Sequence, residues 1–220
     1  MNFLRLVAAV GVFCLAAPGA PALAGALPGP EQVLKNLQSR FENPQTLAPA
    51  RSEDLTGQIW AIESDLNWAV TDAEYVSQDA QWAFQLAYQY LSQGDPRDLW
   101  QAERLALSAA ENAKKTLDKA RELGAKIRGL EVGKPDEAAA RAAQDLLETA
   151  QKLTRTAASA RESAGSLWNL SHGRYREVLG YRLQIASEAL LNETHGLDAE
   201  ARSVEASAQD LVKKLRGNKR

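Results

Sequence analysis

The chain has 220 residues, of which 45% are hydrophobic and 25% are charged, and its formal net charge is −2. This composition supplies enough apolar side chains for a packed core, so it excludes a chain that is disordered throughout. The near-zero net charge excludes a protein that binds polyanions with its whole surface.

The first 24 residues have the pattern of a secretory signal peptide. Arg5 precedes an apolar run over residues 6–17, and residues 22–24 place small side chains before a cleavage point at Gly25. The run is shorter than the ~20 apolar residues that a spanning helix needs, so an uncleaved anchor is the less favoured alternative. We therefore expect a periplasmic or secreted protein without a transmembrane helix after signal cleavage.

Removal of this segment leaves a chain without cysteine, because Cys14 is the only one. The mature chain then has no thiol for a disulfide, a haem attachment or a zinc thiolate. We expect its stability to come from side-chain packing alone.

Residues 25–51 are predicted to form a linker around a short amphipathic helix. Prolines and glycines fill residues 25–30, and two prolines interrupt residues 44–51. Between them, residues 31–43 place four apolar side chains on one side of a helix: Val33, Leu34, Leu37 and Phe41.

The segment 52–92 carries an unbroken heptad pattern. Ser52 is a suitable N-cap, and the run Gly94-Asp95-Pro96 ends the helix and begins the next one. Apolar residues alternate at spacings of four and three, as in a coiled-coil seam. This seam consists of Leu55, Ile59, Ile62, Leu66, Ala69, Ala73, Val76, Ala80, Ala83, Ala87 and Tyr90.

The segment 96–129 repeats this spacing with a seam dominated by alanine. Small seam residues allow two helix backbones to approach closely, although they bury less apolar area. The predicted seam is Leu99, Ala102, Ala106, Ala109, Ala113, Thr116, Ala120, Leu123 and Ile127.

Two further helices are predicted over residues 135–172 and 174–216, with the break at Gly173. The alternative is a single helix of about 60 residues, or ~90 Å, whose apolar stripe would lack partners. In the first helix the inward residues are Ala139, Ala142, Leu146, Leu153, Ala157, Ala160, Ala164 and Leu167. The second is expected to continue inward through Val178, Tyr181, Ile185 and Ala189, and to kink or end at Gly196.

Four segments of similar length, roughly 50 to 65 Å each, indicate one elongated domain. We predict an all-α, antiparallel up-down-up-down four-helix bundle with Ala-rich seams over residues 52–216, followed by a basic tail at 217–220.

Charge favours pairing between the first two helices of this bundle. Residues 52–96 contain eight acids and no Lys or Arg, whereas residues 97–128 contain eight basic residues and five acids. Opposite charges select the partner and its orientation more than they add stability. A hairpin folded at Gly94 would set Glu63 and Asp65 near Lys126 and Arg121, and Asp72 and Glu74 near Lys115 and Lys114.

No residue is assigned a catalytic, cofactor-binding or metal-binding role. His172 and His195 are the only histidines, and neither belongs to a Glu-x-x-His or His-x-x-x-His pattern. Both are expected near helix C-termini, where a positive charge is favourable. Phosphate-binding loops and nucleophile motifs are not recognisable in the sequence.

Aromatic residues supply the candidate partner-binding surface. Trp68, Tyr75 and Trp82 recur every seven residues, and Trp60 and Trp100 lie near them in sequence. The alternative is that they belong to a wide apolar face inside the bundle. An exposed strip would suit another protein, a peptidoglycan strand or an apolar ligand. Without neighbouring basic residues, it would not suit a nucleic acid.

Basic residues at the C-terminus are a second candidate surface. They are either a solvated helix end that complements the helix dipole or a contact for an anionic lipid or polymer. The residues are Lys213, Lys214, Arg216, Lys219 and Arg220.

The leading hypothesis is a non-enzymatic exported bundle that acts by protein–protein contact, as a scaffold, adaptor or assembly subunit. Its partner would be another envelope protein or a second copy of the chain, and no cofactor is expected. One alternative is a ligand-binding or sensing bundle with an aromatic-lined pocket between helices. Another is an enzyme whose carboxylates perform acid–base work.

Overall fold

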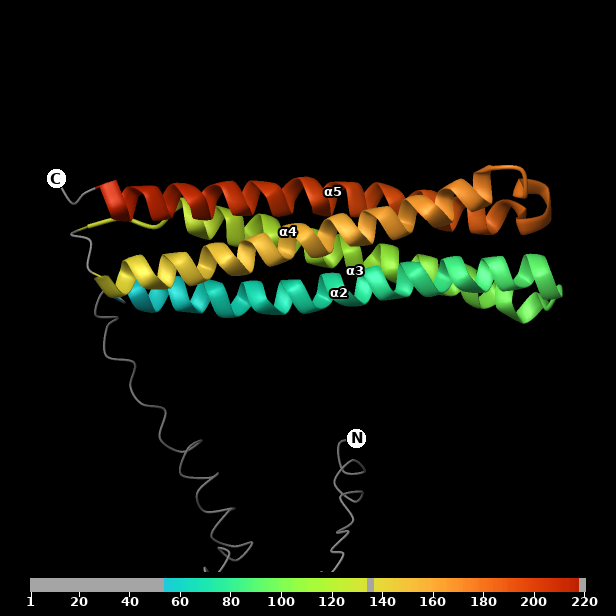
Figure 1. Cartoon of the computed structure of the whole chain (residues 1–220), viewed down its shortest axis with the longest axis horizontal. Helices are drawn as coiled ribbons and strands as arrows, with labels where there is room; N and C mark the ends of the chain where they lie inside the picture. The colour runs from blue at the N-terminus through green and yellow to red at the C-terminus, as the bar shows by residue number, and fades with distance from the viewer. Residues whose placement is uncertain (1–53, 134–136, 218–220) are drawn as a thin grey trace, which may run out of the picture. The chain divides into compact units, whose positions relative to one another are not determined.

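A computed structural model describes residues 54–133 and 137–217, which form four long α-helices (Figure 1). In chain order they are α2 (Leu55–Gln93), α3 (Pro96–Arg128), α4 (Glu137–His172) and α5 (Arg176–Gly217). The prediction of an all-α protein with four packed helices is confirmed. The predicted signal peptide, the short helix at 31–43 and the Ser52 cap lie outside the described residues.

The turn between α2 and α3 follows from three residues. Gly94 adopts a left-handed conformation with φ 76°, and its N–H donates to the Tyr90 carbonyl at 2.8 Å. Asp95 then accepts a hydrogen bond from the Arg97 N–H at 2.9 Å, and Pro96 occupies the first helical position. A glycine C-cap followed directly by an Asp N-cap and proline allows two helices to meet with only two linking residues.

Helix directions are fixed by side-chain contacts between neighbours. Asp65 and Asp72 of α2 pair with Lys126 and Lys119 of α3, so these helices run antiparallel. The pairs Ser171–Ser187 and Arg161–Asp198 show the same for α4 and α5. The predicted alternation of direction along the chain therefore holds.

The two antiparallel hairpins lie side by side in parallel register. Contacts of Glu63 with Thr149 and of Ser77 with Ser159 run in the same chain direction on α2 and α4. Helices α3 and α5 are also parallel neighbours, whereas the described residues of α3 and α4 make no contact. The chain after α3 thus continues into α4, which lies diagonally opposite α3 in the bundle. Of the four neighbouring pairs, α2–α3 and α4–α5 are antiparallel, and α2–α4 and α3–α5 are parallel.

This arrangement gives the bundle two distinct ends. We call the end with the α2–α3 and α4–α5 turns the tip, and the end where α2 begins and α5 ends the base (Figure 1). None of the described helices is apolar enough over its length to cross a lipid bilayer.

The core divides into a base cluster and a tip cluster with different side chains. Alanine supplies 10 of the 24 buried residues of the base cluster, which also contains Leu66, Leu123, Leu146, Leu153 and Leu197. In the tip cluster, alanine supplies 11 of 16. The predicted seams of α2, α3 and α4 are buried apart from their outermost members Leu55, Tyr90 and Leu99, which are partly buried.

Two predictions for α5 are wrong. Val178, Tyr181 and Ile185 are exposed rather than inward, and the core takes the adjacent stripe Leu179, Leu183, Ala186 and Leu190. The sequence offered two neighbouring apolar stripes here, and the one with three leucines buries more area. The kink falls at Gly180 (φ 74°), whereas the helix continues through Gly196.

Gly196 has a packing role instead. A Cβ atom at this position would lie 3.0 Å from Cδ2 of Leu117, which is closer than ordinary van der Waals contact. The missing side chain therefore allows α5 to pass close to α3. The predicted break at Gly173 is confirmed, because α4 ends at His172 and α5 begins at Arg176.

Candidate binding surface

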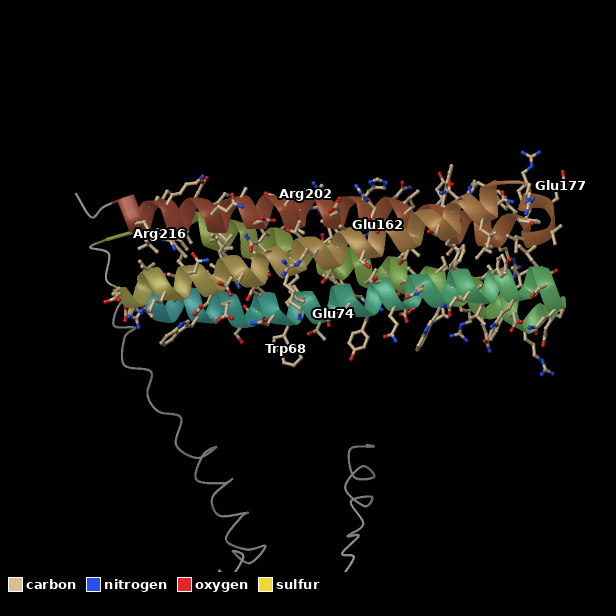
Figure 2. The ribbon with its side chains drawn as sticks, viewed as in Figure 1. Trp68, Glu74, Glu162, Glu177, Arg202 and Arg216 are labelled. Carbon is tan, nitrogen blue, oxygen red and sulfur yellow. The ribbon has the colours of Figure 1, made fainter. Side chains whose placement is uncertain are left out.

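The sequence-predicted aromatic residues lie on the outside of the bundle. Trp68, Tyr75 and Trp82 are 63%, 59% and 50% exposed, and Trp60 and Trp100 are 56% and 54% exposed. Figure 2 shows Trp68 extending from α2 away from the other helices. The alternative that these side chains complete the core is therefore wrong for the isolated chain.

The aromatic residues of α2 divide between two flanks of that helix. Trp68, Tyr75 and Trp82 follow one another at heptad spacing, so they form one line that we call the aromatic stripe. This line is on the side of α3, because Tyr75 and Trp82 line hollows together with residues of α3. Trp60 is eight residues before Trp68, which turns it by about 100° to the other flank.

The surface around the aromatic stripe is mainly polar, and Asp79 is an acid beside Tyr75. The exposed neighbours of the stripe on α2 include a hydroxyl and three amides, namely Ser64, Gln78, Gln85 and Gln89. The acids of α2 face its neighbours: Asp65 and Asp72 pair with lysines of α3, and Glu74 pairs with Lys152 of α4 at 3.1 Å.

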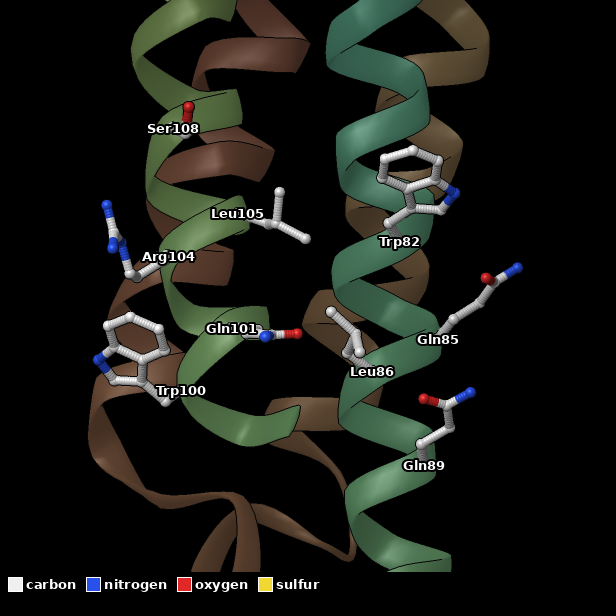
Figure 3. A pocket seen from close by; sticks show the side chains of 9 residues that line it. All are labelled: Trp82, Gln85, Leu86, Gln89, Trp100, Gln101, Arg104, Leu105 and Ser108. Carbon is white, nitrogen blue, oxygen red and sulfur yellow. The ribbon is translucent and has the colours of Figure 1, made fainter. Parts of the chain in front are cut away.

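A groove of about 650 Å³ separates α2 and α3 near the tip. Figure 3 shows Leu86 and Leu105 directed into the space between the two helices, with Trp82 on α2 and Trp100 on α3. The Arg104 guanidinium lies 5.0 Å from the centre of the Trp100 ring, close enough for a cation–π contact. Sequence reasoning did not place Leu86 or Leu105 in a groove, because both flank the seam rather than belong to it.

A second exposed apolar surface, the tip patch, was missed from the sequence. It consists of Trp100 and Leu107 on α3 and of Val178, Tyr181 and Ile185 on α5, all at least 46% exposed. The α5 members were expected in the core. The presence of two parallel apolar stripes in this part of α5 was the signal that one of them would face outward.

Helix register brings the two halves of the tip patch together. Trp100 and Leu107 lie three heptads before Arg121 and Arg128, which contact Glu200 and Ser207 of α5 at 3.9 Å and 3.3 Å. Seven-residue steps keep one side of a bundle helix, so Trp100 and Leu107 also flank α5. Arg128 and Ser207, which contact each other, are 79 residues apart. The same offset along these two parallel helices places Leu107 of α3 beside residue 186 of α5.

The α5 side of the tip patch follows from Gly196. Ile185 lies 11 residues before Gly196, or about three turns, and so shares the side of α5 that meets Leu117 of α3. Tyr181 lies one turn before Ile185 on the same helical stretch, whereas Val178 precedes the kink at Gly180, so helix register places Tyr181 but not Val178 beside Ile185. Leu107 and Ile185 therefore border the same α3–α5 boundary.

A buried ion-pair cluster was also missed. Asp198 is 4% exposed, and its carboxylate pairs with Arg161 of α4 at 3.0 Å and with Arg202, one turn along α5, at 3.3 Å. An acid next to the core residue Leu197 with an arginine four residues later was the available signal. The cluster ties α4 to α5.

The candidate reactive residues are dispersed. His172 is the last residue of α4, as expected, and stacks on Trp168 with ring centres 4.6 Å apart. His195 lies in the middle of α5 and not near a helix end, so that prediction is wrong. Within residues 54–133 and 137–217, no three metal-ligating side chains gather into a site.

One carboxyl group has a perturbed acidity because of burial. Burial raises the pKa of Asp79, which lines a small hollow with Asp72, Tyr75 and Lys115 between α2 and α3. The pKa values of Glu111 and Glu122 are lowered by hydrogen bonds from Lys115 and Lys126 on the same helix.

The described basic residues of the C-terminus are exposed. Lys213 pairs with Asp210 at 3.3 Å, Arg216 donates to the Gln144 side chain at 2.9 Å, and Lys214 faces solvent. Lys219 and Arg220 lie outside the described residues.

Comparison of the chain with protein-family models, with curated proteins and with solved structures finds no significant match, so the surfaces described above carry the functional argument.

Proposed function

We propose that the chain is an exported, non-enzymatic helical bundle that acts by protein–protein contact through the tip patch. In this role it serves as a scaffold, an adaptor or an assembly subunit in the cell envelope. The observation that carries the proposal is the distribution of apolar side chains at the tip, where alanine supplies 11 of the 16 buried core residues while the five larger apolar residues of the tip patch lie outside.

The chemistry of the tip patch favours a protein as its partner. Leu107, Val178 and Ile185 are aliphatic, and such side chains stabilise a complex because burial at an interface removes them from water. Trp100 and Tyr181 add the large aromatic surfaces that dominate protein interfaces. Contiguous exposed apolar surface of this kind is uncommon on soluble monomers and marks interaction sites.

Site-specific photocrosslinking in the intact cell envelope tests this function. A photoreactive phenylalanine analogue would replace Leu107 or Ile185, and matched probes would replace Ala125 and Ala206, which are exposed on α3 and α5 nearer the base. We expect one discrete adduct from both tip positions and none from the control positions. An adduct at twice the chain mass would identify an assembly subunit, and an adduct of another mass would identify an adaptor or scaffold.

Equal crosslinking from all four positions, or none from the tip, would contradict the proposal. The double substitution Leu107→Glu/Ile185→Glu should abolish the tip adduct. Because both side chains are already exposed, we expect it to change the free energy of unfolding by less than about 0.5 kcal/mol.

The groove between α2 and α3 supports a second candidate, a ligand-binding bundle. Its volume of about 650 Å³ lies in the range of small-molecule sites, and two tryptophans and two leucines line it. Tryptophan emission of the purified chain would shift on addition of an apolar ligand. That shift should disappear in Leu86→Ser/Leu105→Ser if the ligand occupies the groove.

A further inference from the structure

We infer that the aromatic stripe of α2 binds a linear β-1,4-linked glycan strand of the bacterial cell wall. This inference concerns a different surface from the tip patch. It would make the chain a link between the wall polymer and whatever protein the tip patch engages.

The first argument is the repeat of the stripe. Successive rings of Trp68, Tyr75 and Trp82 are seven residues apart, or about 10.5 Å along the helix axis. Two pyranose rings of an extended β-1,4-linked strand have nearly this length. Three aromatic side chains at this spacing can therefore meet every second ring of a strand of about five sugars.

The second argument is the chemistry beside the rings. Pyranose rings present C–H groups on their faces, which pack on aromatic side chains, and hydroxyl or acetamido groups at their edges, which need hydrogen-bond partners. Gln78 and Gln85 alternate with the rings, and each amide offers donors and an acceptor. In the described structure these two amides have no protein partner, so they are available to a ligand.

The third argument is charge. Asp65, Asp72 and Glu74 are occupied in ion pairs with α3 and α4, and no Lys or Arg occurs between residues 54 and 96. Asp79 lies beside Tyr75 in a hollow that Lys115 of α3 also lines, so the stripe carries little charge. An exposed surface of aromatic rings and amides with little charge suits the neutral sugar backbone of a glycan.

The tip patch is the internal contrast. Leu107, Val178 and Ile185 offer no flat surface to a sugar ring, and the two aromatic residues of the patch, Trp100 and Tyr181, lie on different helices instead of in one line at heptad spacing. The aromatic stripe and the tip patch therefore differ in composition, as expected if one binds a glycan and the other binds a protein.

Co-sedimentation of the purified chain with purified peptidoglycan sacculi tests the inference. The stripe variant is Trp68→Ala/Trp82→Ala, and the matched control is Trp60→Ala/Tyr88→Ala, which removes two aromatic side chains of similar exposure (56% and 59%) from the other flank of α2. We expect the stripe variant to bind at least about tenfold more weakly and the control to stay within about twofold of the unmodified chain. Gln78→Ala/Gln85→Ala should weaken binding by a smaller factor.

Soluble N-acetylglucosamine hexamers provide a defined probe of the same contact. They should quench or shift tryptophan emission of the unmodified chain and of the control, but not of the stripe variant, and they should compete with sacculi. Equal sacculus binding by stripe variant and control would overturn the inference. So would binding that salt abolishes, or an association of the chain with itself or another protein that only the stripe variant loses.

Failure of this inference is separable from failure of the proposed function. Leu107→Glu/Ile185→Glu should leave sacculus binding unchanged, and Trp68→Ala/Trp82→Ala should leave the tip crosslinks unchanged.

Discussion

The base and tip halves of the bundle follow the same heptad pattern with different side chains. The base core contains leucine, isoleucine and valine from all four helices. In the tip core, α2 and α3 contribute a single valine and otherwise alanine, and most of the leucines come from α5. Each methylene group buried adds about 0.8 kcal/mol, so the base supplies most of the folding free energy.

The difference indicates a division of labour along one domain. The base core is stabilised by large side chains from all four helices, whereas the tip core is mainly alanine and the tip carries five exposed apolar residues. Elements with few buried apolar contacts open locally at lower free energy than the rest of a domain. The half of the bundle that presents the tip patch is therefore the half with the weaker core.

Truncation in the base core should have the largest effect. Leu146 is fully buried, and Leu146→Ala should lower the free energy of unfolding by about 2–5 kcal/mol, because it removes apolar contacts and leaves a cavity. Urea unfolding followed by circular dichroism measures this loss. Leu107→Ala, on the surface, should change it by less than about 0.5 kcal/mol; similar losses in both variants would refute the assignment of the base as the main core.

Enlargement of the tip core should have the next largest effect. Ala83 is fully buried between closely packed helices, so Ala83→Leu should destabilise the protein by about 1–3 kcal/mol through overpacking. The matched surface change, Ala125→Leu, should be nearly neutral. Stabilisation by Ala83→Leu in the same unfolding assay would mean that the tip core is loosely packed rather than tightly packed with small residues.

The ion-pair cluster lies where the two halves meet. Asp198 neighbours Leu197 of the base cluster, and Arg161 comes directly after Ala160 of the tip cluster. Asp198→Asn removes the buried charge that holds Arg161 and Arg202, so we expect a loss of about 1–2 kcal/mol, reduced by the partial exposure of Arg161. The exposed pair offers a control, since Asp210→Asn should cost less than about 0.5 kcal/mol; equal effects would show that the cluster contributes no more than a surface pair.

The smallest expected effect concerns Asp79. Burial raises the pKa of Asp79, so there is a pH range in which the folded chain keeps the carboxyl proton and the unfolded chain has released it. As the pH rises through this range, the carboxyl group of the folded chain becomes charged and the fold loses stability. Asp79→Asn should therefore be the more stable protein at pH 7, by less than about 1 kcal/mol, and the gain should vanish as the pH falls below the carboxyl range. Unfolding midpoints at pH 4 and pH 7 test this, with Asp145→Asn at an exposed position of α4 as the matched variant.

Periodicity predicted most of the fold. The seams of α2 and α3 were identified residue by residue, because an unbroken alternation of four and three leaves one helix face to bury. Periodicity could not distinguish which of the two apolar stripes at the start of α5 is buried, because the kink at Gly180 interrupts the helical repeat. It also could not predict that α3 and α4 lie diagonally opposite, since that depends on how the α2–α3 and α4–α5 hairpins pack on each other.

Charge patterning was informative for one flank of α2 only. Asp65 pairs with Lys126, one of the two basic residues expected near Glu63 and Asp65, but Asp72 pairs with Lys119 and not with Lys115 or Lys114. Glu74 pairs with Lys152 of α4 instead of a residue of α3. Charge matching between α2 and α3 alone cannot show that a third helix packs on the other flank of α2. The aromatic stripe was found from spacing, but its exposure became clear only when every neighbouring helix had a position.

The side-by-side arrangement of the hairpins has a consequence for attachment. The first residue of α2 and the last residue of α5 leave the bundle together at the base, and both turns lie at the opposite end. A fluorophore, affinity tag or surface linker joined to the end of α5 would stand about 50 Å from the tip, which is the length of the shortest helix. A bundle immobilised in that way would point its α2–α3 and α4–α5 turns, and with them the tip patch, away from the surface.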